Sequence, residues 1–265
     1  MRFVVVTVFV VLVSACHLAF PLEDGEPVQC PPVGADDHDE DGDRCGDLVD
    51  NCPGIANAEQ ADGDGDEVGD SCDPQPTTPG NAPLVFDSFR TMSGTWDLYS
   101  NWGFRLDALY SDEPIDTPPY PAITWDEVMP LGFQVQGRVS IDDAGTDVNY
   151  SFSILGNRDA NAGTAQCSLE HVYDPTTPSD RFQASKSAQN YDEISLDGFP
   201  FGKGAVIDFR AGFTSTTITC KITDDTTART VEHASAPRIE PGEFGFDLGH
   251  ARLHLDYVAV YSLVE

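Results

Sequence analysis

Short stretches in which apolar and polar residues alternate dominate the later two thirds of the chain. The alternation is clearest over residues 133–141 and recurs over residues 150–154 and 251–257. Such a pattern is typical of strands that bury one face. Other strand-like segments cover residues 84–89, 94–99, 206–209 and 216–222, and residues 257–261 are apolar or aromatic throughout. Because no segment repeats with a helical period, the pattern predicts an all-β sandwich over residues 84–265.

The charge of the chain is concentrated in the segment before this sandwich. The whole chain of 265 residues has a formal net charge of −31. Residues 23–80 hold 18 of the 45 acidic residues and one basic residue, Arg44. An acidic chain of this kind repels phosphate backbones, so we expect no nucleic-acid partner and a divalent cation instead.

The N-terminus has the pattern of an export signal. Arg2 precedes an apolar run over residues 3–13, which is too short to cross a bilayer. The run ends in Val13-Ser14-Ala15-Cys16, which resembles a bacterial lipoprotein signal. The resemblance implies removal of residues 1–15, a lipid on Cys16 and a tether over residues 16–36. His17 replaces the Asp of inner-membrane retention, which favours an outer-membrane, surface-exposed lipoprotein. The alternative is an ordinary cleaved signal peptide.

The acidic segment places oxygen ligands at alternate positions. Alternating carboxylates on glycine-containing turns can converge on a hard cation such as Ca²⁺, and without one they repel each other. We expect the fold of this segment to depend on metal. The candidate ligands are Asp37, Asp39, Asp41, Asp43, Asp47, Asp50, Asn51, Asp62, Asp64, Asp66, Asp70 and Asp73.

Two known kinds of calcium site are similar to this segment. Asp62 to Asp73 fits part of an EF-hand loop, but flanking helices are not expected, and Glu67 stands where the loop glycine belongs. Asp50-Asn51-Cys52-Pro53 followed by the Asp62–Asp73 block resembles a thrombospondin type 3 repeat over residues 37–74. Arg44 and Cys45 follow Gly42 closely, so the first block looks irregular, and either departure could weaken a site. The remaining alternative is a solvated acidic linker.

Six cysteines remain once Cys16 is set aside, and export favours disulfides among them. Locality suggests that two disulfides lie within the acidic segment, and the last two cysteines lie in or beside strand-like segments. The alternative for this last pair is two buried free thiols. The expected disulfides are Cys30–Cys45, Cys52–Cys72 and Cys167–Cys220.

The sandwich is similar to a known fold family. Phe86-Asp87-Ser88-Phe89 with Gly94-Thr95-Trp96 opens it, and Leu255-Asp256-Tyr257-Val258 lies near its end, as in concanavalin A-like (laminin G-like) jelly rolls. The resemblance implies that the first and last strands pair. That fold hosts lectins, adhesion modules and glycoside hydrolases. The hydrolase motif Glu-x-Asp-x-Glu is missing from this sequence, so we expect no enzyme.

The ligand of the sandwich is less well defined by the sequence. Aromatic residues near a proline-rich stretch could stack on a sugar or a partner protein, although aromatics of this kind more often cover the core. These candidates are Trp102, Tyr110, Tyr120 and Trp125. A proline-rich linker over residues 75–83 is expected to be extended and to hold the sandwich away from the membrane. We therefore expect a calcium-binding, lipid-anchored adhesion protein; the alternatives are a structural envelope spacer and a glycan hydrolase.

Overall fold

The computed structural model describes most of the chain beyond residue 37. The described residues are 30, 38–90, 96–98, 102–105, 107–111, 122–144, 148–159, 163–186, 191–236, 239 and 241–265. Within them the regular structure is all strand, and no helix there is long and apolar enough to cross a membrane. The export signal, Cys16 and the expected tether apart from Cys30 lie outside the described residues.

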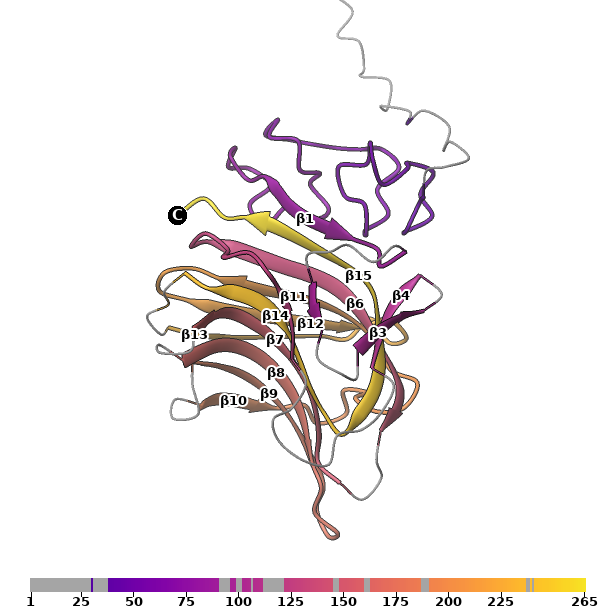
Figure 1. The fold of residues 1–265 in the computed structure, drawn as a ribbon, viewed down its shortest axis with the longest axis vertical. Helices are drawn as coiled ribbons and strands as arrows, with labels where there is room; N and C mark the ends of the chain where they lie inside the picture. Colours follow the sequence, from indigo (N-terminus) through magenta and orange to yellow (C-terminus); the bar gives the residue numbers. More distant parts are fainter. Residues whose placement is uncertain are drawn as a thin grey trace, which may run out of the picture.

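Two antiparallel sheets form a sandwich (Figure 1). The eight-stranded sheet has the order β13-β12-β11-β6-β15-β4-β3, with β1 also paired to β15. Its strands are β1 (Pro83–Asp87), β3 (Trp102–Arg105), β4 (Ala108–Ser111), β6 (Phe133–Ala144), β11 (Val206–Phe213), β12 (Ile218–Asp224), β13 (Thr230–Ser235) and β15 (Ala251–Ser262). The all-β sandwich predicted from the alternation is therefore confirmed, and its two antiparallel sheets are those of the jelly roll that the family resemblance implied.

The seven-stranded sheet has the order β10-β9-β8-β7-β14-β5-β2. Its strands are β2 (Trp96–Leu98), β5 (Ala122–Trp125), β7 (Tyr150–Asp159), β8 (Gly163–Val172), β9 (Ser179–Lys186), β10 (Tyr191–Ser195) and β14 (Glu243–Gly249). The first and last strands of the sandwich, β1 and β15, pair antiparallel as expected, with Phe86 opposite Ala259.

An aromatic core fills the space between the sheets. Phe246 of β14 stacks on Phe152 of β7 at 5.9 Å between ring centroids and meets Phe209 of β11 edge-on at 5.8 Å. Trp96 packs against Phe244 and Trp125, and all these rings except Trp125 are buried. Successive side chains of a strand point to opposite faces of its sheet, and the apolar ones point inward. The alternation in the sequence therefore predicted which residues lie between the two sheets.

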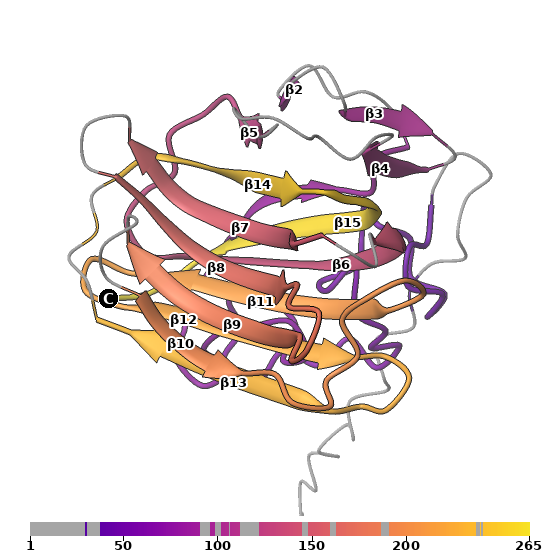
Figure 2. The same ribbon diagram turned by 90° about the horizontal axis from the view of Figure 1, so that it is seen from below.

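The acidic module, which we define as residues 38–81, contains no strand and lies on the outer face of the eight-stranded sheet (Figures 1 and 2). A small apolar cluster joins the two parts: Cys52, Val68 and Cys72 of the module pack with Ala259 and Tyr261 of β15. In the view of Figure 2 the seven-stranded sheet faces the reader and the module lies behind the sandwich. The two outer faces of the sandwich therefore differ, because one carries the module and the other does not.

Three disulfides join the six cysteines in the expected pairs: Cys30–Cys45, Cys52–Cys72 and Cys167–Cys220. The first joins Cys30, which precedes the module, to Cys45 of the module, and the second lies within the module. The third connects β8 with β12 and so links the two sheets across the core.

The proline-rich linker differs from the expected extended spacer. Gln75 and Val264 exchange two hydrogen bonds, at 3.1 and 2.7 Å. The side chain of Asn81 donates to the carbonyl of Ser262 at 2.6 Å. These contacts fold residues 75–81 back against the C-terminal strand, because backbone groups at the end of β15 need partners. The module therefore packs directly against the sandwich, and residues 75–81 do not form an extended spacer between the two.

Candidate functional site

Two aspartate loops in the acidic module repeat the same hydrogen-bond pattern after a shift of 23 residues, from Asp39 to Asp62. Asp39 accepts from the backbone nitrogen of Gly42 at 2.8 Å, and Asp62 accepts from that of Gly65 at 2.7 Å. The second oxygen of each carboxylate accepts from a nitrogen two residues further on, at 2.9 and 3.0 Å. Each loop is therefore folded around its first aspartate.

The backbone angles of the two loops agree as closely. Gly42 and Gly65 have φ values of 79° and 80°, and Arg44 and Glu67 have 83° and 76°. Glu67 thus adopts the left-handed conformation of the glycine it replaces, which strains a residue with a Cβ atom. The spacing that looked irregular in the first block is the same in both loops, because Arg44 is the equivalent of Glu67. The period of 23 residues was the missed sequence signal.

Three carboxylates converge in each loop. One oxygen from each of Asp39, Asp41 and Asp43 lies within 4.8 Å of the others, and the same is true of the equivalent set of Asp62, Asp64 and Asp66. Like charges this close repel unless a cation or a proton intervenes. Two sets of predicted ligands are therefore brought together by the fold.

Several of these oxygens are inaccessible to solvent and have no hydrogen-bond donor. They include Oδ2 of Asp41, both carboxylate oxygens of Asp64 and Oδ2 of Asp73. A buried carboxylate oxygen without a partner is costly, and a divalent cation would satisfy it. Asp73 is 4% exposed and corresponds to Asp50 of the first loop. The donor set, which consists of carboxylates only, fits a hard cation such as Ca²⁺.

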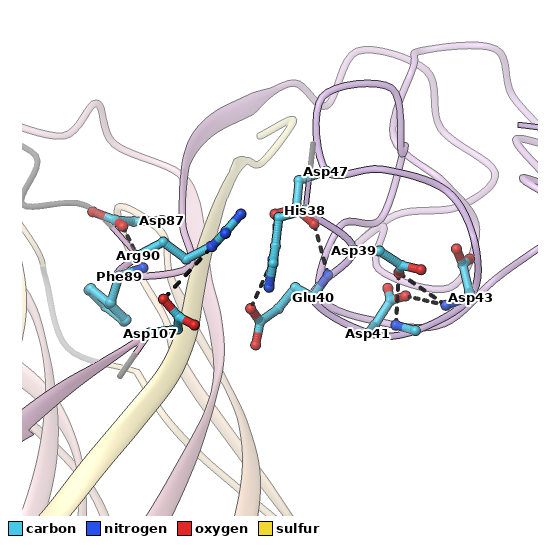
Figure 3. A network of polar contacts seen from close by, with 11 residues as sticks. His38, Asp39, Glu40, Asp41, Asp43, Asp47, Asp87, Phe89, Arg90 and Asp107 are labelled. Atoms are coloured by element: carbon cyan, nitrogen blue, oxygen red, sulfur yellow. Dashed lines mark hydrogen bonds and ion pairs between the residues drawn. The ribbon is translucent and has the colours of Figure 1, made fainter. Parts of the chain in front are cut away.

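The electrostatics at the first loop agree with this reading. The pKa of Asp41 is raised to about 7, chiefly by burial and also by the charges of Asp43, Asp50 and Asp39, although a hydrogen bond from the backbone of Asp43 opposes the shift. Burial also raises the pKa of Glu40 to about 8, with Asp256 of the sandwich as the largest charge contribution. Figure 3 shows His38 beside Glu40 and Asp47, with Nδ1 of His38 3.5 and 3.2 Å from their carboxylates.

The other predicted metal ligands brace the loops. Asp47 and Asp70 occupy equivalent places and accept from the backbone nitrogens of Glu40 and Gly63 at 2.9 and 2.8 Å. The side-chain oxygen of Asn51 accepts from Asn57 at 2.8 Å, which assigns it a structural contact. Asp37 lies outside the described residues.

A cavity of about 570 Å³ lies where the module meets the eight-stranded sheet. Glu40, Asp41 and Ile55 line it from the module, and Arg138 lines it from β6. Arg138 forms a two-point ion pair with Asp208 of the next strand, at 2.8 and 3.2 Å. The charge of Arg138 is thus balanced by Asp208 within the sheet. The cavity is lined by acidic as well as basic side chains.

Of the aromatic residues predicted to bind a ligand, the three that the structure describes do not share one surface. Trp102 is 6% exposed and belongs to the core, and Trp125 stacks on Phe244 at 6.0 Å. Tyr110 of β4 stacks on His254 at 4.9 Å on the eight-stranded sheet. Tyr120 lies outside the described residues.

The outer face of the seven-stranded sheet carries a polar lattice. Because Phe182 and Ala184 of β9 belong to the core, Arg181, Gln183 and Ser185 point outward. The strand register places side chains in a row across five strands, and the hydroxyl groups of the two serines in it are 2.8 Å apart. The row consists of Asp247, Ser153, Ser168, Gln183 and Glu193.

Gln183 is the centre of this lattice. Its Nε2 donates to Glu170 at 3.0 Å and to Glu193 at 3.4 Å. Its Oε1 and the hydroxyl of Ser185 are buried and have no partner. Burial raises the pKa of Glu170, the nearby Arg181 opposes this shift, and Glu193 raises the pKa again. We did not expect these residues from the sequence, although residues 165–170 alternate apolar and polar.

Comparisons with known proteins define the fold alone. No family model matches the sequence, and neither does any curated protein. Peanut lectin is similar in structure, with a TM-score of 0.52, 11% identity and coverage of 69% of this chain and 97% of the lectin. Winged bean acidic lectin, solved with methyl-α-D-galactose, has a TM-score of 0.51 and 12% identity, with coverage of 70% and 100%.

An enzyme is among the similar structures as well. Xylan β-1,4-xylosidase from Bacillus halodurans has a TM-score of 0.50 and 10% identity, covering 70% of this chain. This chain spans 40% of the length of the xylosidase. All three likenesses support a concanavalin A-like β-sandwich.

Proposed function

We propose that this protein binds glycans through the outer face of its seven-stranded sheet, and that calcium stabilises its acidic module. The observation that carries the glycan proposal is the polar lattice around Gln183, in which buried polar atoms have no partner in the protein. Buried polar atoms are normally hydrogen-bonded. Polar atoms that lack a partner at an outer face therefore suit a ligand that supplies hydroxyl groups.

The position of the module favours this face over the opposite one. The module covers part of the eight-stranded sheet through Tyr261, Ala259 and the contact between Gln136 and the carbonyl of Cys72. The seven-stranded sheet carries no such cover among the described residues. The lectin-like fold supports a sugar ligand, since winged bean acidic lectin is complexed with a galactoside.

Calcium is proposed for the two aspartate loops. Asp39, Asp41, Asp43 and Asp50 would hold one ion, and Asp62, Asp64, Asp66 and Asp73 would hold the other. The ion would neutralise the converging carboxylates, and the rest of the stabilisation comes from the chain's own hydrogen bonds around each first aspartate.

Lipid attachment at Cys16 and an outer-membrane, surface-exposed location remain part of the proposal, supported by the signal-like sequence. The test is fractionation of cells that express the parent or the Cys16→Ser variant. We expect the parent in the membrane fraction and the variant in the soluble fraction. Equal membrane retention of the two would contradict the lipid anchor.

The glycan proposal is tested by retention of the Cys16→Ser chain on a panel of immobilised polysaccharides, in calcium and in chelator. We expect retention on a defined glycan, reduced strongly by Gln183→Ala and unaffected by Gln134→Ala on the opposite sheet. Because we propose no enzymatic activity, no new reducing ends should form. Release of sugar would favour a hydrolase, and no retention in either condition would favour a structural spacer.

A further inference from the structure

The polar lattice on the seven-stranded sheet is rich in hydrogen-bond acceptors. The carboxylates of Glu170 on β8 and Glu193 on β10 lie on either side of Gln183 and share its single amide nitrogen, at 3.0 and 3.4 Å. Ionised carboxylates only accept hydrogen bonds. One amide with two hydrogens therefore serves two groups that together can accept several more.

Two further atoms make the shortage of donors larger. Gln183 is 3% exposed and its Oε1 has no partner, and Ser185, two residues along β9, is 1% exposed and its hydroxyl has no partner. The orientation of the Gln183 amide is fixed by the glutamates, because the reverse orientation would direct its oxygen at a carboxylate. These two buried side chains belong to the same outer face as Glu170 and Glu193.

Positive charge at this place comes from Arg181. Its guanidinium lies 3.4 Å from Glu193, and 40% of its side chain is exposed. Its interaction with Glu193 occurs at the solvent-facing side, where screening makes an ion pair weak. Arg181 is also the register partner of Glu170 and lowers the pKa of its carboxyl group, but burial is the larger cause and raises it. One exposed guanidinium therefore serves both glutamates.

We propose that this lattice selects glycans with free amino groups, that is, polymers of deacetylated amino sugars. This inference rests on the proposed glycan binding and specifies its ligand class. A protonated amine supplies three donors and a positive charge, which are the two things that Glu170, Glu193 and Gln183 lack. A uronic-acid polymer would bring further carboxylates to a face that already holds two, and a chain of net charge −31 would repel it.

Isothermal titration calorimetry on the Cys16→Ser chain tests this with four hexasaccharides. They are the hexamers of glucosamine, of N-acetylglucosamine and of galacturonic acid, and the neutral glucose hexamer cellohexaose. We expect the glucosamine hexamer to bind at least about tenfold more tightly than its acetylated counterpart, since a hydrogen-bonded charge pair contributes that much. Glu170→Gln and Glu193→Gln should each remove most of this preference. Circular dichroism of each variant verifies that it is folded.

Two controls separate recognition from general attraction between a polycation and an acidic protein. Glu59→Gln and Glu127→Gln remove the same charge from exposed positions elsewhere, and they should leave binding unchanged. Equal weakening by these controls would overturn the proposal. Equal affinity for the acetylated hexamer or cellohexaose would also overturn it while leaving glycan binding intact. The absence of binding to all four, and to the polysaccharide panel, would overturn both.

Discussion

The acidic module and the β-sandwich of this protein fold by different means. The sandwich buries rows of aromatic side chains between two sheets, and strand pairing provides partners for its backbone groups. The module has few buried apolar residues, chiefly Val68 and its half-cystines, and uses aspartate side chains to hold its backbone. The comparison shows how a segment too polar to build a core can still adopt one conformation.

The same carboxylates carry a cost that the sandwich avoids. In the sandwich, Asp208 meets Arg138 in a two-point ion pair. In the module, three carboxylates of each loop converge, with one oxygen of each within 4.8 Å of the others. The module should therefore depend on conditions in solution far more than the sandwich does, and five experiments test this difference.

Removal of calcium should have the largest effect. With chelator in excess, we expect amide hydrogen exchange in residues 38–81 to approach the rate of an unfolded chain, because six converging carboxylates lose their counter-charge. The strands of the sandwich should keep their protection. Hydrogen exchange with mass spectrometry measures both regions in one sample, and equal protection of the module with and without calcium would refute its dependence on metal.

A cavity in the aromatic core should destabilise the sandwich, which removal of calcium leaves protected. Phe246→Ala removes a fully buried ring between the sheets and should lower the free energy of unfolding by about 3–5 kcal/mol. Urea denaturation followed by tryptophan fluorescence measures the loss. Val49→Ala, at a position 52% exposed in the module, is the control and should change the value by less than about 0.5 kcal/mol. A loss of similar size in the control would contradict the assignment of the core.

Disulfides should matter more where there is little core. Replacing Cys52 and Cys72 by alanine opens a loop of 20 residues and should lower the free energy of unfolding of the module by about 3 kcal/mol. Because the module has little core, we expect this loss to unfold it. Limited proteolysis should then cut within residues 38–81. The matched variant without Cys167 and Cys220 should still give a folded sandwich, since the aromatic core remains. Proteolysis of the sandwich in this variant would show that the two regions depend equally on their disulfides.

Docking of the module depends on a contact that one substitution can remove. Gln136→Ala leaves the buried carbonyl of Cys72 without its donor and should destabilise the docked module by about 1–3 kcal/mol. Gln134→Ala is the matched control, because Gln134 lies two residues earlier on β6 and its Nε2 has no partner. Exchange rates of the module amides compare the two variants, and an equal response would exclude this contact as a determinant of docking.

The strained residue of the second loop should give the smallest effect. Glu67→Gly relieves a φ of 76° and should stabilise the module by about 1 kcal/mol, measured as a higher midpoint of thermal unfolding in calcium. Glu59→Gly, at an exposed position without positive φ, should lower the midpoint slightly. A lower midpoint for Glu67→Gly would mean that its side chain contributes more than the strain costs.

The sequence predicted the strands with the strongest alternation. β6, β7, β11, β12 and β15 all lie where the period of two is clear, and the pairing of β1 with β15 followed from the family resemblance. β8 and β9 were not identified, and the edge strands β10 and β13 have too little apolar periodicity to stand out. The site on the seven-stranded sheet was missed for the same reason, because Glu170, Gln183 and Glu193 lie on these strands.

By itself, the sequence determined the all-β class and the aspartate spacing, because each is a local pattern. Two disulfide pairs followed from nearness along the chain, and the third joins the two cysteines that then remained. The tertiary structure alone decided that residues 75–81 fold back on β15, that the module covers one sheet, and that Gln183 lies between two glutamates from different strands. Alternation tells which residues share a face of a strand. It does not tell which strands become neighbours or which face is covered, since those depend on contacts between residues far apart in the chain.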